Sequence, residues 1–199
     1  MQYSTFAAID IGSYDVILEI FEISKKQGIR SVDKICHRME LGKDTYTLGK
    51  IRPEMEEELC RVLADFVRIM EGYRVDDYRA TASSAISEAS NSLYVLGKIH
   101  QLTGFSVTVL SNSEQRFLSY KALAAMEDNF NKIIEKGTAI LDLDGGSFQI
   151  SLFDKDALVT TQNIRMGSLR IRERLAGIQS ETEHYEEMVE ELIWNEVDR

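Results

Sequence analysis

The order of apolar segments predicts an α/β fold with a mixed sheet, followed by the start of a second, similar α/β domain. Three strand-like runs open the chain, and helix-like and strand-like segments then alternate. New strand-like runs begin near residue 138, and their first hairpin repeats the pattern that opens the chain. The composition is that of a globular protein, with 44% hydrophobic and 28% charged residues. We expect one domain over residues 1–124 and a second that begins at residue 125 and runs to 199.

The first sixty residues indicate an antiparallel meander followed by a long helix. Strand-like runs cover residues 6–11, 15–24 and 30–41, and Gly12-Ser13 closes the first of them. Pro53 is tolerated at the first position of a helix, and Gly72 is a plausible end. Apolar residues between these points recur at three- and four-residue spacing, which predicts one buried face: Met55, Leu59, Leu63, Phe66, Val67 and Met70.

Further elements alternate along the middle of the chain. A short strand is expected around Tyr78–Ala82, and Ser84 could cap a helix that runs to about Leu102. The β-branched run SVTVLS predicts a strand at residues 106–111. A long helix is then expected from about Asn112 into the 130s, with one apolar face made of Phe117, Tyr120, Leu123 and Ala124.

Two hairpins share one residue pattern. AIDIGSYDVIL near the start and AILDLDGGSFQISL after residue 138 each hold an apolar strand, an Asp, a Gly/Ser turn and a second strand. Backbone N–H groups at such tight turns can bind phosphate oxygens without a helix dipole. The duplication therefore predicts two phosphate-binding loops. A further strand, LVTTQNI, and a helix near Ser168–Leu175 follow the second hairpin.

The last twenty residues predict an amphipathic acidic helix. Ser180 and Glu183 have the spacing of a capping box, so the helix is expected to begin near Thr182. This segment holds eight acids and one Arg, a net of −7 out of the chain's −10. Its apolar stripe needs a partner, either a second copy of the chain or the sheet of residues 138–163. The stripe consists of Tyr185, Met188 or Val189, Leu192 and Trp194.

Several classes of protein are disfavoured by composition. No apolar run is long enough for a bilayer span, and the first residues lack the pattern of a signal peptide. Cys36 and Cys60 have no metal or disulfide spacing, which favours reduced thiols in a cytoplasmic protein. The three histidines, His37, His100 and His184, show no ligand spacing. A nearly neutral body disfavours a nucleic-acid partner.

Five segments in order resemble the exopolyphosphatase/guanosine pentaphosphate phosphatase family of the actin-like ATPase superfamily. The resemblance covers residues 5 to 178, and LGKDTYTLGKI fits the family's linker before the long helix. It implies an actin-like, ribonuclease H-like fold whose second domain has a full sheet, so residues 125–199 would be only its beginning. The segments are AIDIGSYDVILEI, ASSAISEASN, HQLTGFSVTVLSNSEQRFLSY, LDLDGGSFQISLF and IRMGSLRIRERL.

The resemblance implies hydrolysis of a terminal phosphoanhydride, in polyphosphate or a guanosine pentaphosphate-type substrate. By position, Glu114 matches the family's catalytic base, and Asp10, Asp142 and Gln149 match positions that organise a divalent cation such as Mg²⁺. The phosphate-facing positions are Gly12, Ser13, Gly145, Gly146 and Ser147. From the residues alone, the preferred explanation of Glu114 is a capping box with Ser111 at a helix start.

Other positions depart from the family pattern. The changes remove two expected arginines and add negative charge, so long polyphosphate should bind poorly. Three functions remain open: a phosphohydrolase, a non-catalytic phosphate- or nucleotide-binding paralogue, and, least favoured, a kinase of the same superfamily. The departing residues are Tyr14, Asp15, Ile17, Ser87, Asp144 and Gln149.

Overall fold

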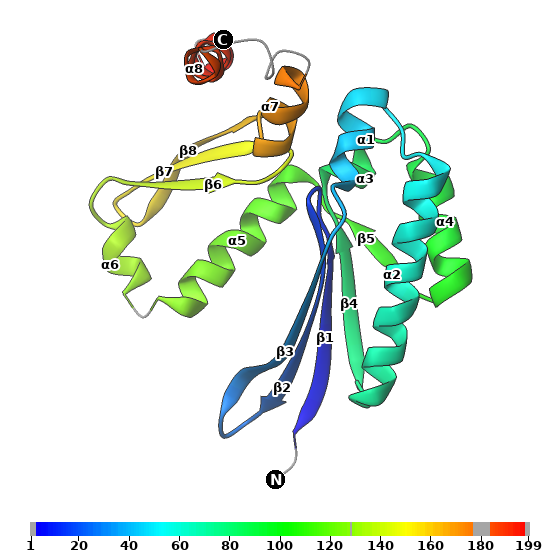
Figure 1. Ribbon diagram of the computed structural model, residues 1–199. Coiled ribbons are helices and arrows are strands. Elements are labelled where there is room, and N and C mark those ends of the chain that lie inside the picture. Colours follow the sequence, from blue (N-terminus) through cyan, green and yellow to red (C-terminus); the bar gives the residue numbers. More distant parts are fainter. Residues whose placement is uncertain (1–2, 128, 177–183, 198–199) are drawn as a thin grey trace. The chain divides into compact units, whose positions relative to one another are not determined.

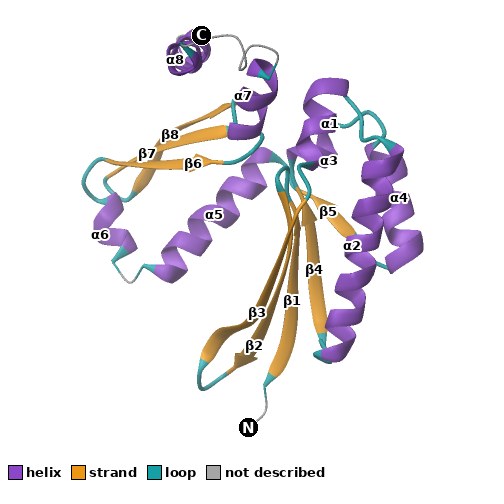
Figure 2. Cartoon of the chain, in the orientation of Figure 1, coloured by secondary structure: helices purple, strands orange, loops and turns teal. Residues whose placement is uncertain are grey.

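The computed structural model describes residues 3–127, 129–176 and 184–197, and the chain forms two compact units that divide between Leu110 and Ser111. Figures 1 and 2 show the helices and strands of each unit. Both units are α/β, as the order of apolar segments predicts. The compact-unit boundary precedes the domain boundary expected at residue 124, because the helix that begins at Asn112 packs on the second sheet.

The first unit is built on a five-stranded mixed sheet in the order β3-β2-β1-β4-β5. The first three strands form the predicted antiparallel meander, whereas β4 and β5 pair in parallel with β1 and β4. Parallel pairing places the carboxyl ends of β1 and β4 at the same edge, where the first Gly/Ser turn lies. The strands are β1 (Ser4–Ile11), β2 (Asp15–Ser24), β3 (Gly28–Arg38), β4 (Asp77–Ala82) and β5 (Val107–Val109).

Helices α2 and α4 cover one face of this sheet (Figure 1). The predicted helix from Pro53 to Gly72 is confirmed as α2, and its apolar stripe is buried against alternate residues of β1 and β2. Burying a large aliphatic side chain stabilises a fold by roughly 1.5–3 kcal/mol, so this interface holds the unit together. The helices are α1 (Leu41–Leu48), α2 (Pro53–Gly72), α3 (Ser84–Ser87) and α4 (Ser92–Thr103).

Two expectations for the first unit are wrong. The helix expected from Ser84 to Leu102 is split into α3 and α4, because the Asn91 side chain bonds both the N–H and the carbonyl of Ile51 at 3.0 and 2.8 Å. These bonds hold the chain in a turn between the helices. The expected linker before Pro53 is helix α1, and its buried Asp44 accepts hydrogen bonds from the N–H and Nε groups of Arg52.

The second unit contains a three-stranded antiparallel sheet, β6-β7-β8, with α5 packed against it (Figure 1). Tyr120 of α5 stacks edge-to-face on Phe153 at 5.2 Å and donates a hydrogen bond to Ser151. The long helix predicted from Asn112 ends at Met126, earlier than expected. The elements are α5 (Asn112–Met126), α6 (Phe130–Ile134), β6 (Thr138–Leu143), β7 (Phe148–Asp154), β8 (Ala157–Ile164), α7 (Ser168–Leu175) and α8 (Tyr185–Val197).

The acidic carboxyl-terminal segment is helical, as predicted, and α8 begins at Tyr185. The predicted capping residues Ser180 and Glu183 lie outside the described residues. Arg174 of α7 forms an ion pair with Glu196 of α8 at 3.0 Å. Within the described residues, no helix is both long enough and apolar enough to cross a bilayer.

Candidate functional site: two phosphate-loop hairpins

Loop 1 (residues 12–14) joins β1 to β2 and is closed by a hydrogen bond from the Gly12 N–H to the Asp15 carbonyl at 3.0 Å. The start of α1 binds the loop's carbonyl groups. Gly42 donates to the Ser13 carbonyl at 2.8 Å, and the N–H groups of Met39 and Glu40 both donate to Tyr14. The carbonyls of Ser13 and Tyr14 are therefore occupied within the protein.

Loop 2 (residues 144–147) joins β6 to β7 and has the same construction. The Asp144 N–H donates to the Ser147 carbonyl at 2.9 Å, which matches the closing bond of loop 1. The amino-terminal end of α7 binds the carbonyl groups of this loop. Ser168 donates to Asp144 at 3.0 Å, and Leu169 and Arg170 donate to Gly145 at 3.1 and 3.3 Å.

The side chain of Arg170 binds a third carbonyl of loop 2: its Nε donates to the Gly146 carbonyl at 2.7 Å. In a trans peptide the N–H points opposite to the carbonyl of the preceding residue. Since the carbonyls of Asp144, Gly145 and Gly146 point at α7, the N–H groups of the next three residues point away from it. Among the described residues, no protein acceptor binds the N–H of Gly146 or Ser147. Successive N–H groups of this kind form an anion-binding site.

The first loop also leaves donors open. Within the described part of the chain, the N–H groups of Ser13 and Tyr14 have no protein acceptor. The Asp10 carboxylate lies beside this loop, since a Cβ added at Gly12 would stand 3.8 Å from its Oδ2. Asp10, Gly12 and Ser13 thus lie together at the end of β1, and their role in binding phosphate or metal stays a prediction.

Gly167 allows α7 to approach loop 2. A Cβ at this position would lie 2.3 Å from the Asp144 carbonyl oxygen and 2.3 Å from the Gly145 carbonyl carbon. No side chain fits there without a shift of the backbone. Gly167 and Arg170 were not among the predicted site residues. The available signal was a glycine before the helix start in IRMGSLRIRERL, but the prediction considered only the turn residues of each hairpin.

Asp142 and Gln149 lie opposite each other on β6 and β7. Both line a cavity of about 290 Å³ between the sheet and α5. Asp142 Oδ2 accepts a hydrogen bond from Ser119 Oγ at 3.2 Å, and Gln149 is only 7% exposed. No group of three or more His, Cys, Asp or Glu side chains suited to a metal ion occurs within the described residues.

Glu114 forms the capping box that its spacing from Ser111 predicts. Its Oε2 accepts hydrogen bonds from the Ser111 N–H at 2.9 Å and from the Ser111 Oγ at 2.7 Å. The Glu114 N–H donates to Ser111 Oγ at 3.3 Å. The structural explanation of this residue is therefore confirmed, and its catalytic role stays a prediction.

Three hydroxyl groups meet next to loop 1. Tyr46 Oη lies 2.6 Å from Ser13 Oγ and 2.7 Å from Ser84 Oγ. The neighbouring Ser83 donates its N–H to the Ile11 carbonyl at 3.2 Å, and its buried Oγ has no hydrogen-bond partner in the described structure. These hydroxyls fix loop 1 against the α3 region. Sequence reasoning missed Tyr46 because α1 was interpreted as a linker.

Asp15 is the first residue of β2 and affects the pKa of the neighbouring Cys36 thiol. Partial desolvation and then the Asp15 carboxylate raise the pKa of Cys36 above its ordinary value. The Cys36 thiol therefore stays protonated at neutral pH, which makes it a poor nucleophile.

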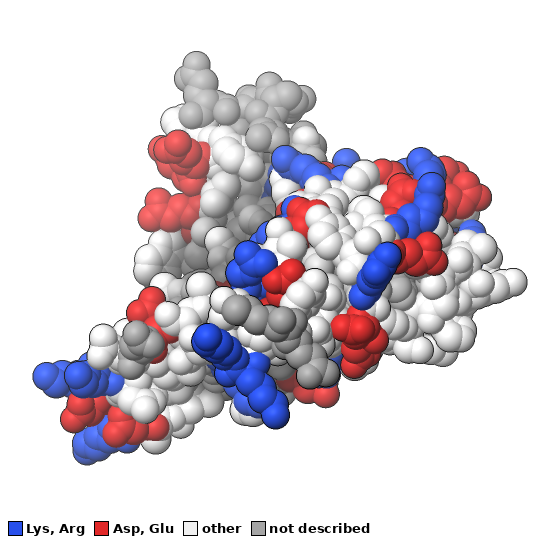
Figure 3. All heavy atoms as spheres, turned by 90° about the horizontal axis from the view of Figure 1, so that it is seen from below, with Lys and Arg blue, Asp and Glu red and all other residues white. Residues whose placement is uncertain are grey.

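On the face drawn in Figure 3, basic and acidic side chains are interspersed.

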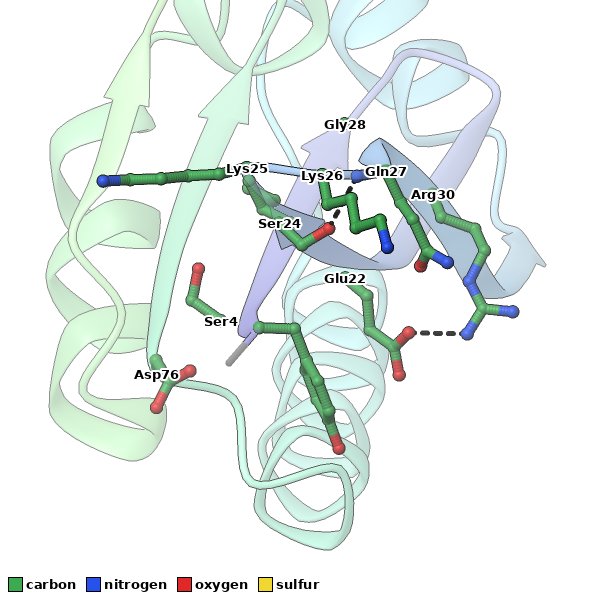
Figure 4. A pocket seen from close by; sticks show the side chains of 11 residues that line it. Ser4, Glu22, Ser24, Lys25, Lys26, Gln27, Gly28, Arg30 and Asp76 are labelled. Atoms are coloured by element: carbon green, nitrogen blue, oxygen red, sulfur yellow. Dashed lines mark hydrogen bonds and ion pairs between the residues drawn. The ribbon is translucent and has the colours of Figure 1, made fainter. Parts of the chain in front are cut away.

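A further cavity of the first unit lies away from loop 1. It measures about 1070 Å³ and is lined by the first residues of β1 and the turn between β2 and β3 (Figure 4). In this view Arg30 pairs with Glu22, which leaves Lys25 and Lys26 as exposed cations. Loop 1 is at the other end of β1, roughly 25 Å away at 3.3 Å per residue. This cavity is therefore separate from loop 1.

Comparison with known proteins places the chain among phosphatases. The sequence model of the Ppx/GppA phosphatase family matches residues 19–199. Exopolyphosphatase 1 of Mycobacterium leprae is 25% identical over 144 residues, which cover 72% of this chain and 41% of that protein. A bifunctional 3-dehydroquinate synthase/phosphatase of Fusobacterium nucleatum is 22% identical over 174 residues. It matches 84% of this chain, which spans 26% of that protein's length.

Solved structures share the fold. An exopolyphosphatase-like protein superposes with a TM-score of 0.82 at 20% identity, covering 100% of this chain and 61% of the other. The Ppx/GppA enzyme of Aquifex aeolicus gives 0.73 at 21% identity, covering 99% of this chain and 64% of the other. These likenesses confirm the predicted actin-like fold. The family match includes loop 2 and Glu114 and begins after loop 1. By sequence and by fold, the chain belongs to the Ppx/GppA phosphatase family.

Proposed function

We propose that this chain supplies the phosphate-binding loops of a phosphohydrolase that acts on terminal phosphoanhydrides, in polyphosphate or a guanosine pentaphosphate-type compound. The observation that carries the proposal is the construction of loop 2, whose carbonyls are bound by α7 while its N–H groups point away. Loop 1 repeats this construction with the start of α1. Family membership and the names of the exopolyphosphatase relatives favour the same substrate class.

The proposed roles follow from the donors and acceptors of each unit. The free N–H groups of the two loops would bind phosphate oxygens and orient the terminal phosphoryl group for attack by water. Glu114 would accept the proton of that water. We propose that Asp10 and Asp142 lie across one cleft with Glu114 at its rim. A crystal structure with the two turns on opposite faces of the molecule would contradict this arrangement.

A divalent cation such as Mg²⁺ fits the residues that flank loop 2 on β6 and β7. Mg²⁺ is commonly held by one or two carboxylates together with substrate phosphates and water, so it does not need three protein ligands. Asp142 offers a carboxylate, and the Gln149 carboxamide oxygen lies in the same cavity. Asp10 is the proposed third oxygen donor. The cation would neutralise phosphate charge during the reaction.

A non-catalytic phosphate- or nucleotide-binding protein is the second candidate. Gln149 provides no charge to a cation, and Ile17 and Ser87 provide no guanidinium to a phosphate. A protein of this kind would bind the same ligands without hydrolysing them.

Binding and turnover measured together separate the two candidates. Phosphate release would be followed with polyphosphate, guanosine pentaphosphate and simple nucleotides, each with Mg²⁺ or Mn²⁺, and binding by calorimetry. We expect binding of short phosphate chains and weak or absent turnover of long polyphosphate. Binding without any turnover would favour the second candidate. Robust turnover of long polyphosphate would contradict the expected weak site, and absence of binding to every compound would contradict both candidates.

A further inference from the structure

The two loops can be compared residue by residue because their closing hydrogen bonds match. The hydrogen bond from the Gly12 N–H to the Asp15 carbonyl in loop 1 corresponds to the bond from the Asp144 N–H to the Ser147 carbonyl in loop 2. Asp144 therefore stands where loop 1 has a glycine. Ser13, which follows Gly12, corresponds to Gly145.

The two loops differ in the hydrogen bonding of the corresponding N–H groups of Ser13 and Gly145. The Ser13 N–H has no protein acceptor among the described residues. The Gly145 N–H is bound by Asp144 Oδ1 at 2.6 Å. Asp144 thus places its own carboxylate on the first of the three N–H groups that loop 2 directs away from α7.

We propose that Asp144 is a built-in competitor for phosphate at loop 2, which selects against densely charged polyphosphate chains. The inference rests on the proposed phosphate-binding function of the loops. A carboxylate oxygen accepts from a backbone N–H in the same way as a phosphate oxygen, so the two compete for Gly145. When the carboxylate stays in place, it also repels a phosphate bound to the next two amides.

Alanine and asparagine at position 144 separate the two effects. Asp144→Ala removes both the charge and the acceptor, and it adds no atom because the Cβ is already present. Asp144→Asn removes the charge but keeps an oxygen that can accept from Gly145. Asp154→Asn is the matched control, since it changes the net charge equally at an exposed position at the end of β7.

The experiment is calorimetric titration of each protein with inorganic tripolyphosphate, with and without Mg²⁺. A freed, charge-assisted N–H contact is worth about tenfold or more in affinity. We expect Asp144→Ala to bind at least about tenfold more tightly than the unmodified chain, Asp144→Asn to fall between them, and Asp154→Asn to be unchanged. The ¹⁵N–¹H spectrum gives a second readout, because the Gly145 amide proton should move upfield in Asp144→Ala and return downfield with tripolyphosphate.

The outcomes distinguish this inference from the proposed function. If every protein binds tripolyphosphate at the loops with equal affinity, Asp144 is not a competitor, and the loops still bind phosphate. An equal gain in Asp154→Asn would assign the effect to net charge and overturn the inference. If tripolyphosphate binds none of the four proteins, the proposed function and the inference both fail.

Discussion

The Cα of Gly167 lies so close to loop 2 that a methyl group there would overlap three backbone atoms of the loop. Backbone atoms cannot turn aside as the end of a flexible side chain can. The position of α7, and with it the direction of the loop's N–H groups, therefore depends on the absence of a side chain at residue 167.

Gly167→Ala should lower the free energy of unfolding by about 1–3 kcal/mol and weaken tripolyphosphate binding at loop 2. Thermal unfolding and calorimetry measure the two effects. Gly97→Ala is the control, because Gly97 lies inside α4 with nothing within 4 Å of an added Cβ. Alanine there should stabilise the helix by roughly 0.5–1 kcal/mol. Unchanged stability and binding in Gly167→Ala would show that α7 does not hold the loop.

Glu114 can be tested without disturbing α5, because glutamine also completes a capping box. Glu114→Gln should leave the melting temperature nearly unchanged. Any phosphate release by the chain should fall by about 10²–10⁴-fold if Glu114 accepts the proton of water. Glu114→Ala removes the cap as well and should cost about 1 kcal/mol of stability. An unaffected rate in Glu114→Gln would leave the residue with a capping role alone.

Helix α5 is attached to its sheet mainly by polar and aromatic contacts. The sequence predicted an apolar face with Phe117, Tyr120, Leu123 and Ala124, yet no residue of α5 is fully buried. Arg116 donates to Thr161 at 3.0 Å, and Ser119 donates to Asp142. The helix that carries Glu114 thus also contacts Asp142 of β6.

Tyr120→Ala should destabilise the second unit by about 2 kcal/mol, because it removes the contact with Phe153 and the hydrogen bond to Ser151. Phe117→Ala, an aromatic truncation one helical turn earlier, should change stability by less than about 0.5 kcal/mol, since Phe117 is 57% exposed. Denaturant unfolding measures the loss of stability in each of the two variants. Equal losses would mean that α5 packs through the predicted apolar face.

Elements with strong periodicity were predictable from the sequence, and elements fixed by distant contacts were not. Apolar alternation marked β1, β2, β6 and β7, and the stripe after Pro53 marked α2. The break before α4 depends on Asn91 binding Ile51, forty residues away in sequence. For the site, the duplicated hairpins located both loops. Helix α7 was predicted near Ser168–Leu175 and α1 was not, and in neither case were the bonds to the loop carbonyls predictable, because they form only in the folded chain.

At the scale of the whole molecule, α8 carries an apolar stripe on a highly acidic segment. Tyr185, Val189 and Leu192 are half-buried, whereas Trp194 is 58% exposed. We propose that a second copy of the chain covers this stripe. The alternative is that the stripe packs within the same chain, against the sheet of residues 138–163.

Light scattering over a concentration series should then give a dimer mass at high concentration. Trp194 is the chain's single tryptophan, so its emission should shift to the blue as the dimer forms. Trp194→Ala should weaken the dimer. A monomer at every concentration, with emission already blue-shifted, would instead mean that the stripe folds back on its own chain.

The account depends on the open N–H groups of the two loops, and an NMR titration of the ¹⁵N-labelled chain with tripolyphosphate and Mg²⁺ observes them directly. The account predicts that the amides of Ser13, Tyr14, Gly146 and Ser147 move downfield together and saturate at one ligand concentration. Chemical-shift changes confined to amides that line the cavity beside Lys25 and Lys26, with no change at the loop amides, would contradict it.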